Sequence, residues 1–190
     1  MRTTSKTLYL FLLGLGTCAS TILAQSPGTF TATGSMTTPR YFPTATLLAD
    51  GRVLIAGGDV IDAPPFATQS SAELYDPRSG MFTATGKMMT PRSAHTATLL
   101  PDGRVLITGG GVSCECDRFG DPSFVSAELY DPDTGTFSAT GDMTTARLRS
   151  TATLLNNGKV LIAGGFQRDG GTLNIRALAR AELYDPATGT

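Results

Sequence analysis

Residues 96–110 read TATLLPDGRVLITGG, and this stretch decides the fold because the chain contains it three times. Residues 44–58 (TATLLADGRVLIAGG) and 151–165 (TATLLNNGKVLIAGG) are close copies. Each copy has two short aliphatic runs separated by Asp-Gly or Asn-Gly. This dipeptide is the strongest short signal for a β-hairpin, because both turn residues can adopt positive φ. Self-similarity of this kind predicts a repeat architecture.

Two further motifs complete each repeat. Ala-Glu-Leu-Tyr predicts a third strand, and the Asp-Pro-x-x-Gly that follows predicts a tight turn. A fourth strand is expected at Phe-Thr/Ser-Ala-Thr-Gly, which also precedes the first repeat. The third-strand motif stands at 72–77, 127–132 and 181–186, and the fourth-strand motif at 30–34, 82–86 and 137–141. The chain therefore divides into circularly permuted units at about 30–81, 82–136 and 137–190, and no window has sustained helical spacing.

Four short antiparallel strands in a period of roughly 50 residues are typical of a β-propeller blade. An arginine opens each unit (Arg40, Arg92 and Arg147), Gly-Gly ends the second strand, and Tyr-Asp-Pro precedes an aromatic residue. In these features residues 28–190 resemble the kelch repeats of the galactose-oxidase-like propellers, with Phe where kelch repeats often have Trp. The resemblance implies an all-β fold, a partial β-propeller of three four-stranded antiparallel kelch-type blades.

The number of repeats raises a question of closure. Propellers usually close with about 4–8 blades, so three blades leave sheet faces and strand edges open to association. Three interpretations follow: a piece of a longer protein, which we favour, two chains that assemble a six-bladed ring, and an open arc. We therefore expect either self-assembly or further blades to close the ring.

The N-terminal segment has the pattern of a secretory signal peptide. Arg2 and Lys6 precede the apolar residues 8–15, and Ala24 ends a run of small and apolar residues before Gln25. This pattern predicts a signal peptide over 1–24, a kelch-repeat domain over 25–190 and an exported, periplasmic or extracellular, protein. The alternative is a lipoprotein anchored at Cys18. No apolar run reaches the roughly 20 residues of a stable membrane span.

The charge balance excludes several classes of function. With 15 Lys and Arg against 16 Asp and Glu and a net charge of −1, the 190-residue chain is not a basic nucleic-acid binder. Its single histidine, His95, excludes a metal site built on several histidines. We expect no metal, no cofactor and no catalytic residue.

The connections between second and third strands carry the candidate ligand-binding residues. These connections, at 59–71, 111–126 and 166–180, differ in length and residue type while the strands hardly change, and we expect them on one face. The candidate ligand-binding residues are Arg118, Phe119, Arg168, Arg176, Arg180 and His95. With Arg149, the last three arginines make the third unit the most basic. Cys114 and Cys116 are expected to form a disulfide rather than two free thiols.

The three recurrent arginines allow two interpretations. They could bind ligand carboxylates, or each could brace its own unit against Glu73, Glu128 or Glu182, and recurrence in every unit favours bracing. We therefore expect an exported, non-catalytic binding or interaction module that recognises protein or glycan through its long loops. The alternative is an incomplete kelch-type sugar-processing enzyme, mutarotase- or lyase-like, whose site needs missing blades.

Overall fold

The structure is a computed structural model of the chain, and it describes residues 28–60, 67–112, 122–168 and 175–190. By their contacts the residues fall into two units, 1–32 and 33–190, and every described strand lies in the second. The described residues are all-β, with no helix among them. No helix in the described ranges is therefore long and apolar enough to cross a membrane.

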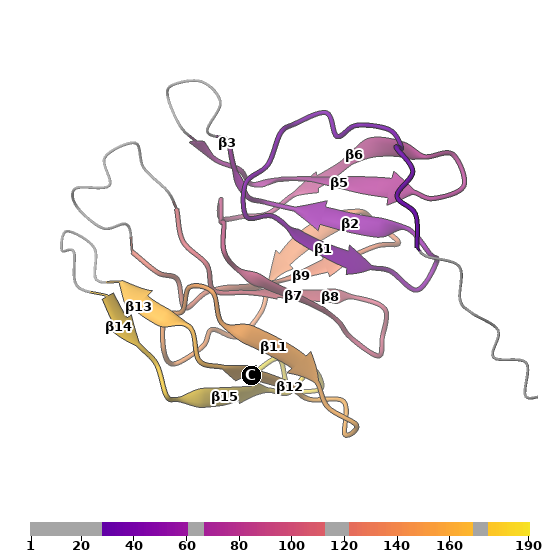
Figure 1. The fold of residues 1–190 in the computed structure, drawn as a ribbon. Helices are drawn as coiled ribbons and strands as arrows, with labels where there is room; N and C mark the ends of the chain where they lie inside the picture. The colour runs from indigo at the N-terminus through magenta and orange to yellow at the C-terminus, as the bar shows by residue number, and fades with distance from the viewer. Residues whose placement is uncertain (1–27, 61–66, 113–121, 169–174) are drawn as a thin grey trace, which may run out of the picture. The chain divides into compact units, whose positions relative to one another are not determined.

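Three larger antiparallel sheets follow one another along the chain (Figure 1). The first sheet has the order β1 (Thr44–Leu47), β2 (Val53–Ala56), β5 (Ser71–Asp76) and β6 (Met81–Lys87). The second has β7 (Thr96–Leu99), β8 (Val105–Thr108), β9 (Ala127–Asp131) and β10 (Thr136–Ala139). The third has β11 (Thr151–Leu154), β12 (Val160–Ala163) and β15 (Ala181–Tyr184).

Two small hairpins extend the connections after the second strands. They are β3 (Asp59–Val60) with β4 (Ala67–Thr68), and β13 (Phe166–Arg168) with β14 (Ile175–Ala177). The sequence analysis treated these connections as loops, so the hairpins are an addition to the expected fold.

The second sheet is packed on both faces. β1 contacts β7, β7 contacts β11, and β6 contacts β10, so the three sheets lie side by side in chain order. Val105 and Ile107 of β8 pack in a cluster with the first sheet, whereas Leu106 between them packs in a cluster with the third. Because successive strand residues point to opposite faces, this continuous apolar run is buried on both sides.

The repeated strands are confirmed, but the detail of the Asp-Gly turn was wrong. In the first turn Gly51 has φ +88°, while Asp50 is not among the residues of positive φ. The Gly51 N–H donates to the Leu48 carbonyl at 3.0 Å, and the Asp50 carboxylate accepts the Arg52 N–H at 2.9 Å. The turn is therefore a longer loop that ends on a left-handed glycine rather than a two-residue turn.

The predicted strand over 30–34 is also corrected, because residues 28–36 form no strand. A strand needs a neighbour to satisfy its backbone donors and acceptors. The sheets contain no described partner for this segment, although its sequence is identical to that of 82–86 in β6.

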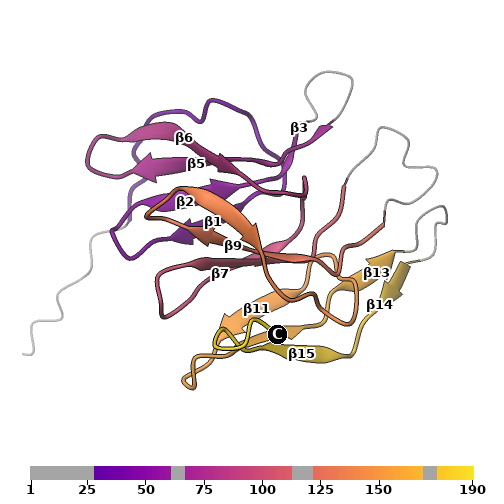
Figure 2. The same cartoon turned by 180° about the vertical axis from the view of Figure 1, so that it is seen from behind.

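The connections between second and third strands lie at the same end of the sheets as the connections from one sheet to the next, as expected. Tyr41, which leads into the first sheet, pairs with Asp59 in the connection after β2, and Leu148 pairs with Phe166 in the same way. Figure 2 shows β3, β13 and β14 beyond the same end of the sheets. We call this end, with its described residues 40–44, 57–60, 67–71, 92–96, 109–112, 122–126, 147–151, 164–168 and 175–180, the long-loop end.

Candidate functional site

The three recurrent arginines are structural. Arg92 Nη2 lies 2.7 Å from Glu128 Oε1, and the Arg92 side chain is fully buried. Arg92 Nη1 also donates to the carbonyls of Gly109 (2.7 Å) and Ser126 (3.0 Å). Equivalent buried pairs join Arg40 to Glu73 and Arg147 to Glu182 at 2.9 and 2.7 Å. The bracing interpretation is therefore confirmed. The three guanidinium groups are buried away from solvent, including the Nε atoms of Arg92 and Arg147, which have no hydrogen-bond partner.

The electrostatics of the glutamates agree with this role. Burial alone would raise the pKa of Glu73, but hydrogen bonds from the Thr37 N–H and from Arg40 outweigh it and lower the pKa below its usual value. For Glu182 the burial effect is likewise outweighed, by Arg147 and Thr144, so its pKa is lowered. Both carboxylates are thus held ionised by the arginine that precedes their sheet together with Thr37 or Thr144.

His95 lies buried between the first and second sheets rather than at an open surface. Its Nε2 is 2.9 Å from Thr44 Oγ1, and its Nδ1 has no hydrogen-bond partner. Burial, and then the nearby charge of Arg92, lowers its pKa to about 3, so the ring is neutral at ordinary pH. Its described hydrogen bond is to Thr44, and no described interaction joins it to Arg168, Arg176 or Arg180.

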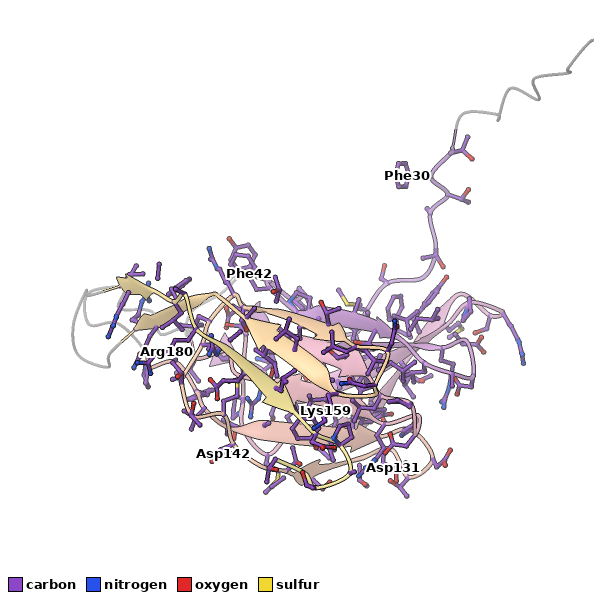
Figure 3. All side chains as sticks on the ribbon, turned by 90° about the horizontal axis from the view of Figure 1, so that it is seen from below. Phe30, Phe42, Asp131, Asp142, Lys159 and Arg180 are labelled. Carbon is purple, nitrogen blue, oxygen red and sulfur yellow. The ribbon has the colours of Figure 1, made fainter. Side chains whose placement is uncertain are left out.

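Arg176 and Arg180 line one pocket of about 250 Å³, which also contacts Thr145, Gln167 and Leu178. Both arginines are exposed, and Figure 3 shows Arg180 at the end of the molecule opposite to Lys159 and Asp131. Arg168 is half-buried on β13, paired in register with Ile175 of β14. No carboxylate in the described part of the chain forms an ion pair with any of these three arginines.

Arg149 is a fourth arginine without an ion pair among the described residues, and it has aromatic neighbours that the sequence analysis missed. Its guanidinium carbon lies 4.5 Å from the ring centre of Phe42 and 5.9 Å from that of Phe166, which are cation–π distances. The signal that could have found Phe42 is that its position holds a different residue in each unit: Phe42, Ala94 and Arg149.

These three positions share an unusual backbone conformation. Phe42, Ala94 and Arg149 have φ of 53°, 52° and 52°, the left-handed region that favours glycine. The Arg149 N–H donates to the Ala94 carbonyl at 2.9 Å, and the Ala94 N–H donates to the Phe42 carbonyl at 3.3 Å. A chain of backbone hydrogen bonds therefore links the starts of the three sheets at the long-loop end.

The opposite end of the sheets has mostly paired charges. Arg52 lies 2.6 Å from Asp50, Arg104 lies 2.7 Å from Asp102, and Lys159 lies 3.0 Å from Asp185. A larger hollow of about 410 Å³ lies there. Turn formation accounts for three of its four aspartates, because Asp50, Asp102 and Asp131 each accept a backbone N–H two residues on. In the described residues no cluster of His, Cys, Asp or Glu is suited to a metal ion.

Four of the candidate residues lie outside the described residues: Cys114, Cys116, Arg118 and Phe119. The expected disulfide and the binding roles of Arg118 and Phe119 therefore stay predictions. The same holds for Cys18 and the signal peptide, which fall within residues 1–27.

The structure thus places four arginines of the third unit, which have no ion pair within the described ranges, at one end of an all-β scaffold. A scan against models of known protein families gives no match, and neither does a search of curated proteins.

Proposed function

We propose that the chain is an exported binding module, built as kelch-type propeller blades, that recognises an anionic partner at the long-loop end of its third sheet. The observation that carries the proposal is the charge at that end. Arg149, Arg168, Arg176 and Arg180 have no ion-pair partner among the described residues, whereas the charged residues of the turns at the other end are mostly paired.

The propeller part of the proposal is supported by the arrangement of the sheets. Their first strands, β1, β7 and β11, lie next to one another, and the outer strands β6 and β10 are also in contact. Each larger sheet follows the chain from inner to outer strand, as a blade does.

The chemistry of arginine indicates the class of ligand. A guanidinium group donates paired hydrogen bonds to carboxylates and remains protonated at every ordinary pH. The chain as a whole has a net charge of −1, so overall attraction would not bring an anion to it. Recognition at this end therefore depends on the local arginines, and the aromatic ring of Phe42 beside Arg149 suits the apolar face of a sugar or a side chain.

We favour binding over the enzyme alternative for a chemical reason. Arg149, Arg168, Arg176 and Arg180 carry guanidinium groups, which remain protonated at ordinary pH and are therefore poorly suited to act as a general acid or base. His95 is buried among structural contacts, and its lowered pKa keeps the ring neutral at ordinary pH.

The test measures binding by calorimetry with two carboxylate probes, an oligogalacturonate and a poly-glutamate peptide, which separate a glycan source from a protein source. The fully methyl-esterified oligogalacturonate is the uncharged control. We expect Arg176→Gln/Arg180→Gln to weaken binding about tenfold or more. Added salt should weaken binding of the wild-type chain.

The matched control is Arg52→Gln/Arg104→Gln, which removes the same charge from the opposite end. It should leave the affinity unchanged. Equal losses in both double variants, or no binding of either charged probe, would contradict the proposal.

A further inference from the structure

Arg149 is held at the long-loop end by aromatic rings. Its guanidinium carbon lies 4.5 Å from the ring centre of Phe42 and 5.9 Å from that of Phe166. A cation–π contact attracts the guanidinium to a ring but supplies no acceptor oxygen for its N–H donors. Within the described ranges no hydrogen bond or ion pair to the protein uses these donors, so they are available to an anion.

The backbone beneath this side chain is fixed. Leu148 and Phe166 exchange two backbone hydrogen bonds of 2.8 and 3.0 Å, and the Arg149 N–H donates to the Ala94 carbonyl at 2.9 Å. A Cβ at Gly165 would collide with the Leu148 carbonyl oxygen, so glycine allows the two segments to approach. Arg149 therefore projects from a rigid backbone, which lowers the entropy that is lost when a ligand binds.

The β13–β14 hairpin has a different arginine on its opposite face. Gln167 is paired in register with Arg176, so the two side chains share one face, and Phe166 beside Gln167 points to the other face. Gln167 and Arg176 line the pocket of about 250 Å³ together with Arg180, whereas Phe166 does not line it. The ring that Arg149 approaches and the pocket of Arg176 thus lie on opposite sides of the hairpin.

The face with Phe166 is turned toward the second unit. Leu148 is the bridge partner of Phe166, and a Cβ at Gly111 would lie 3.2 Å from Leu148 Cδ2. The long-loop end therefore has two separate cationic groups. We call Arg149, Phe42 and Phe166 the inner subsite, and Gln167, Arg176 and Arg180 the outer pocket. Figure 3 shows Phe42 and Arg180 toward the same end of the molecule.

This separation restricts the ligand. A single carboxylate does not contact both cationic groups, because the hairpin lies between them. A ligand that uses both must carry several carboxylates along a chain. At the inner subsite the aromatic rings favour a carboxylate that stands beside the C–H face of a sugar ring, as in a uronic acid. A glutamate carboxylate stands on a flexible stem, which loses more rotamer freedom when it is ordered.

We propose that the inner subsite and the outer pocket bind different carboxylates of one acidic glycan chain that crosses the β13–β14 hairpin. The inference rests on the proposed function and adds that the ligand is a polymer and that Arg149 contacts it directly. Once one carboxylate is bound, the second binds within the same complex, so a long chain binds more tightly than a single sugar.

The dependence of affinity on chain length tests this arrangement. A long oligogalacturonate is measured by calorimetry and galacturonic acid by competition, and both affinities are expressed per carboxylate. We expect the wild-type chain to bind the long ligand about 100-fold more tightly. Arg149→Gln should reduce this gain to less than about tenfold, and so should Arg176→Gln/Arg180→Gln, because each variant keeps only one of the two cationic groups.

The matched control is Arg104→Gln, an exposed arginine at the opposite end, which should keep the full gain. Arg149→Lys keeps the charge but loses the planar fork, so it should lower the gain as Arg149→Gln does. Phe42→Ser removes the ring beside Arg149 and should weaken binding of the long ligand about fivefold. Far-UV circular dichroism verifies that each variant is folded.

The outcomes separate this inference from the proposed function. If the wild-type chain binds both ligands but shows no gain with length, or if Arg149→Gln keeps the gain, the inference is overturned and the proposed function stands. If a poly-glutamate peptide shows a gain that depends on Arg149 and oligogalacturonate shows none, the glycan assignment is wrong. If neither charged probe binds, the proposed function fails and this inference fails with it.

Discussion

Removal of Arg92 should be the most damaging single change at the buried ion pairs. The Arg92 side chain is fully buried and that of Glu128 is 3% exposed, so Arg92→Met leaves a carboxylate in the interior without its cation. Glu128 would keep hydrogen bonds from the Met89 and Thr90 N–H groups, but the carbonyls of Gly109 and Ser126 would lose their donor.

The expected loss follows from the cost of an unpaired buried charge, about 3–5 kcal/mol. A domain of this size has a total stability of about 5–15 kcal/mol, so the loss is a large part of it. Urea unfolding followed by far-UV circular dichroism measures it, since the chain has no tryptophan to report by fluorescence. If Arg92→Met does not fold, Arg147→Met gives a milder case, because its partner Glu182 is 18% exposed.

The control is Arg104→Met. Its ion pair with Asp102 is exposed, with 38% and 43% of the two side chains accessible, and such pairs contribute about 1 kcal/mol or less. The double variant Arg92→Met/Glu128→Met should recover part of the loss because it leaves no buried charge. A loss for Arg92→Met no larger than that for Arg104→Met would refute the reasoning.

Three further predictions concern other contacts. The pKa of His95 is lowered from 6.5 to about 3 in the folded chain, so below pH 6.5 the unfolded chain binds a proton that the folded chain does not. The free energy of unfolding should therefore fall as the pH drops below 6.5, by up to about 1.4 kcal/mol per pH unit. His95→Ser should flatten this slope, as measured by urea unfolding at a series of pH values. Gly86→Ala should destabilise the chain more than Gly28→Ala, because a Cβ at Gly86 would overlap the Gly135 carbonyl oxygen, while Gly28 has open space and no positive φ; the two melting temperatures are compared. Ala94→Gly should stabilise the chain by about 1 kcal/mol in the same assay, since φ at Ala94 is +52°, and an unchanged or lower stability would contradict this.

The strands could be predicted from the sequence because each repeat has the same residue preferences for extended backbone and for turns. Val105-Leu106-Ile107 favours extended backbone, Gly109-Gly110 ends it with positive φ at both glycines, and the two neighbouring repeats give the same answer. An arginine stands at the position of Arg92 in every unit, whereas the other arginines of the third unit have no such counterparts. Because a residue needed by every unit is expected to serve packing, this difference predicted a structural role for Arg92.

Other features depend on neighbours that local sequence does not specify. Residues 30–34 have the composition of a strand, but a strand also requires a partner edge. The approach of Arg149 to Phe42 joins the starts of the third and first sheets, so no spacing along the chain could predict it. Which carboxylates the fold brings near likewise decides that Arg176 and Arg180 have no ion pair with another described residue.

The three positions of positive φ at the long-loop end share a backbone conformation but differ in side chain. Phenylalanine, alanine and arginine occupy equivalent positions at 42, 94 and 149 and have nearly the same φ, although none is glycine. The strain therefore comes from the way each sheet begins, because three different side chains would not produce it alike. Since the backbone holds this conformation whatever residue is present, the side chain at each position can vary without changing the fold. Variation at a fixed conformation is consistent with the binding role proposed above for the long-loop end, where one of the three positions is Arg149.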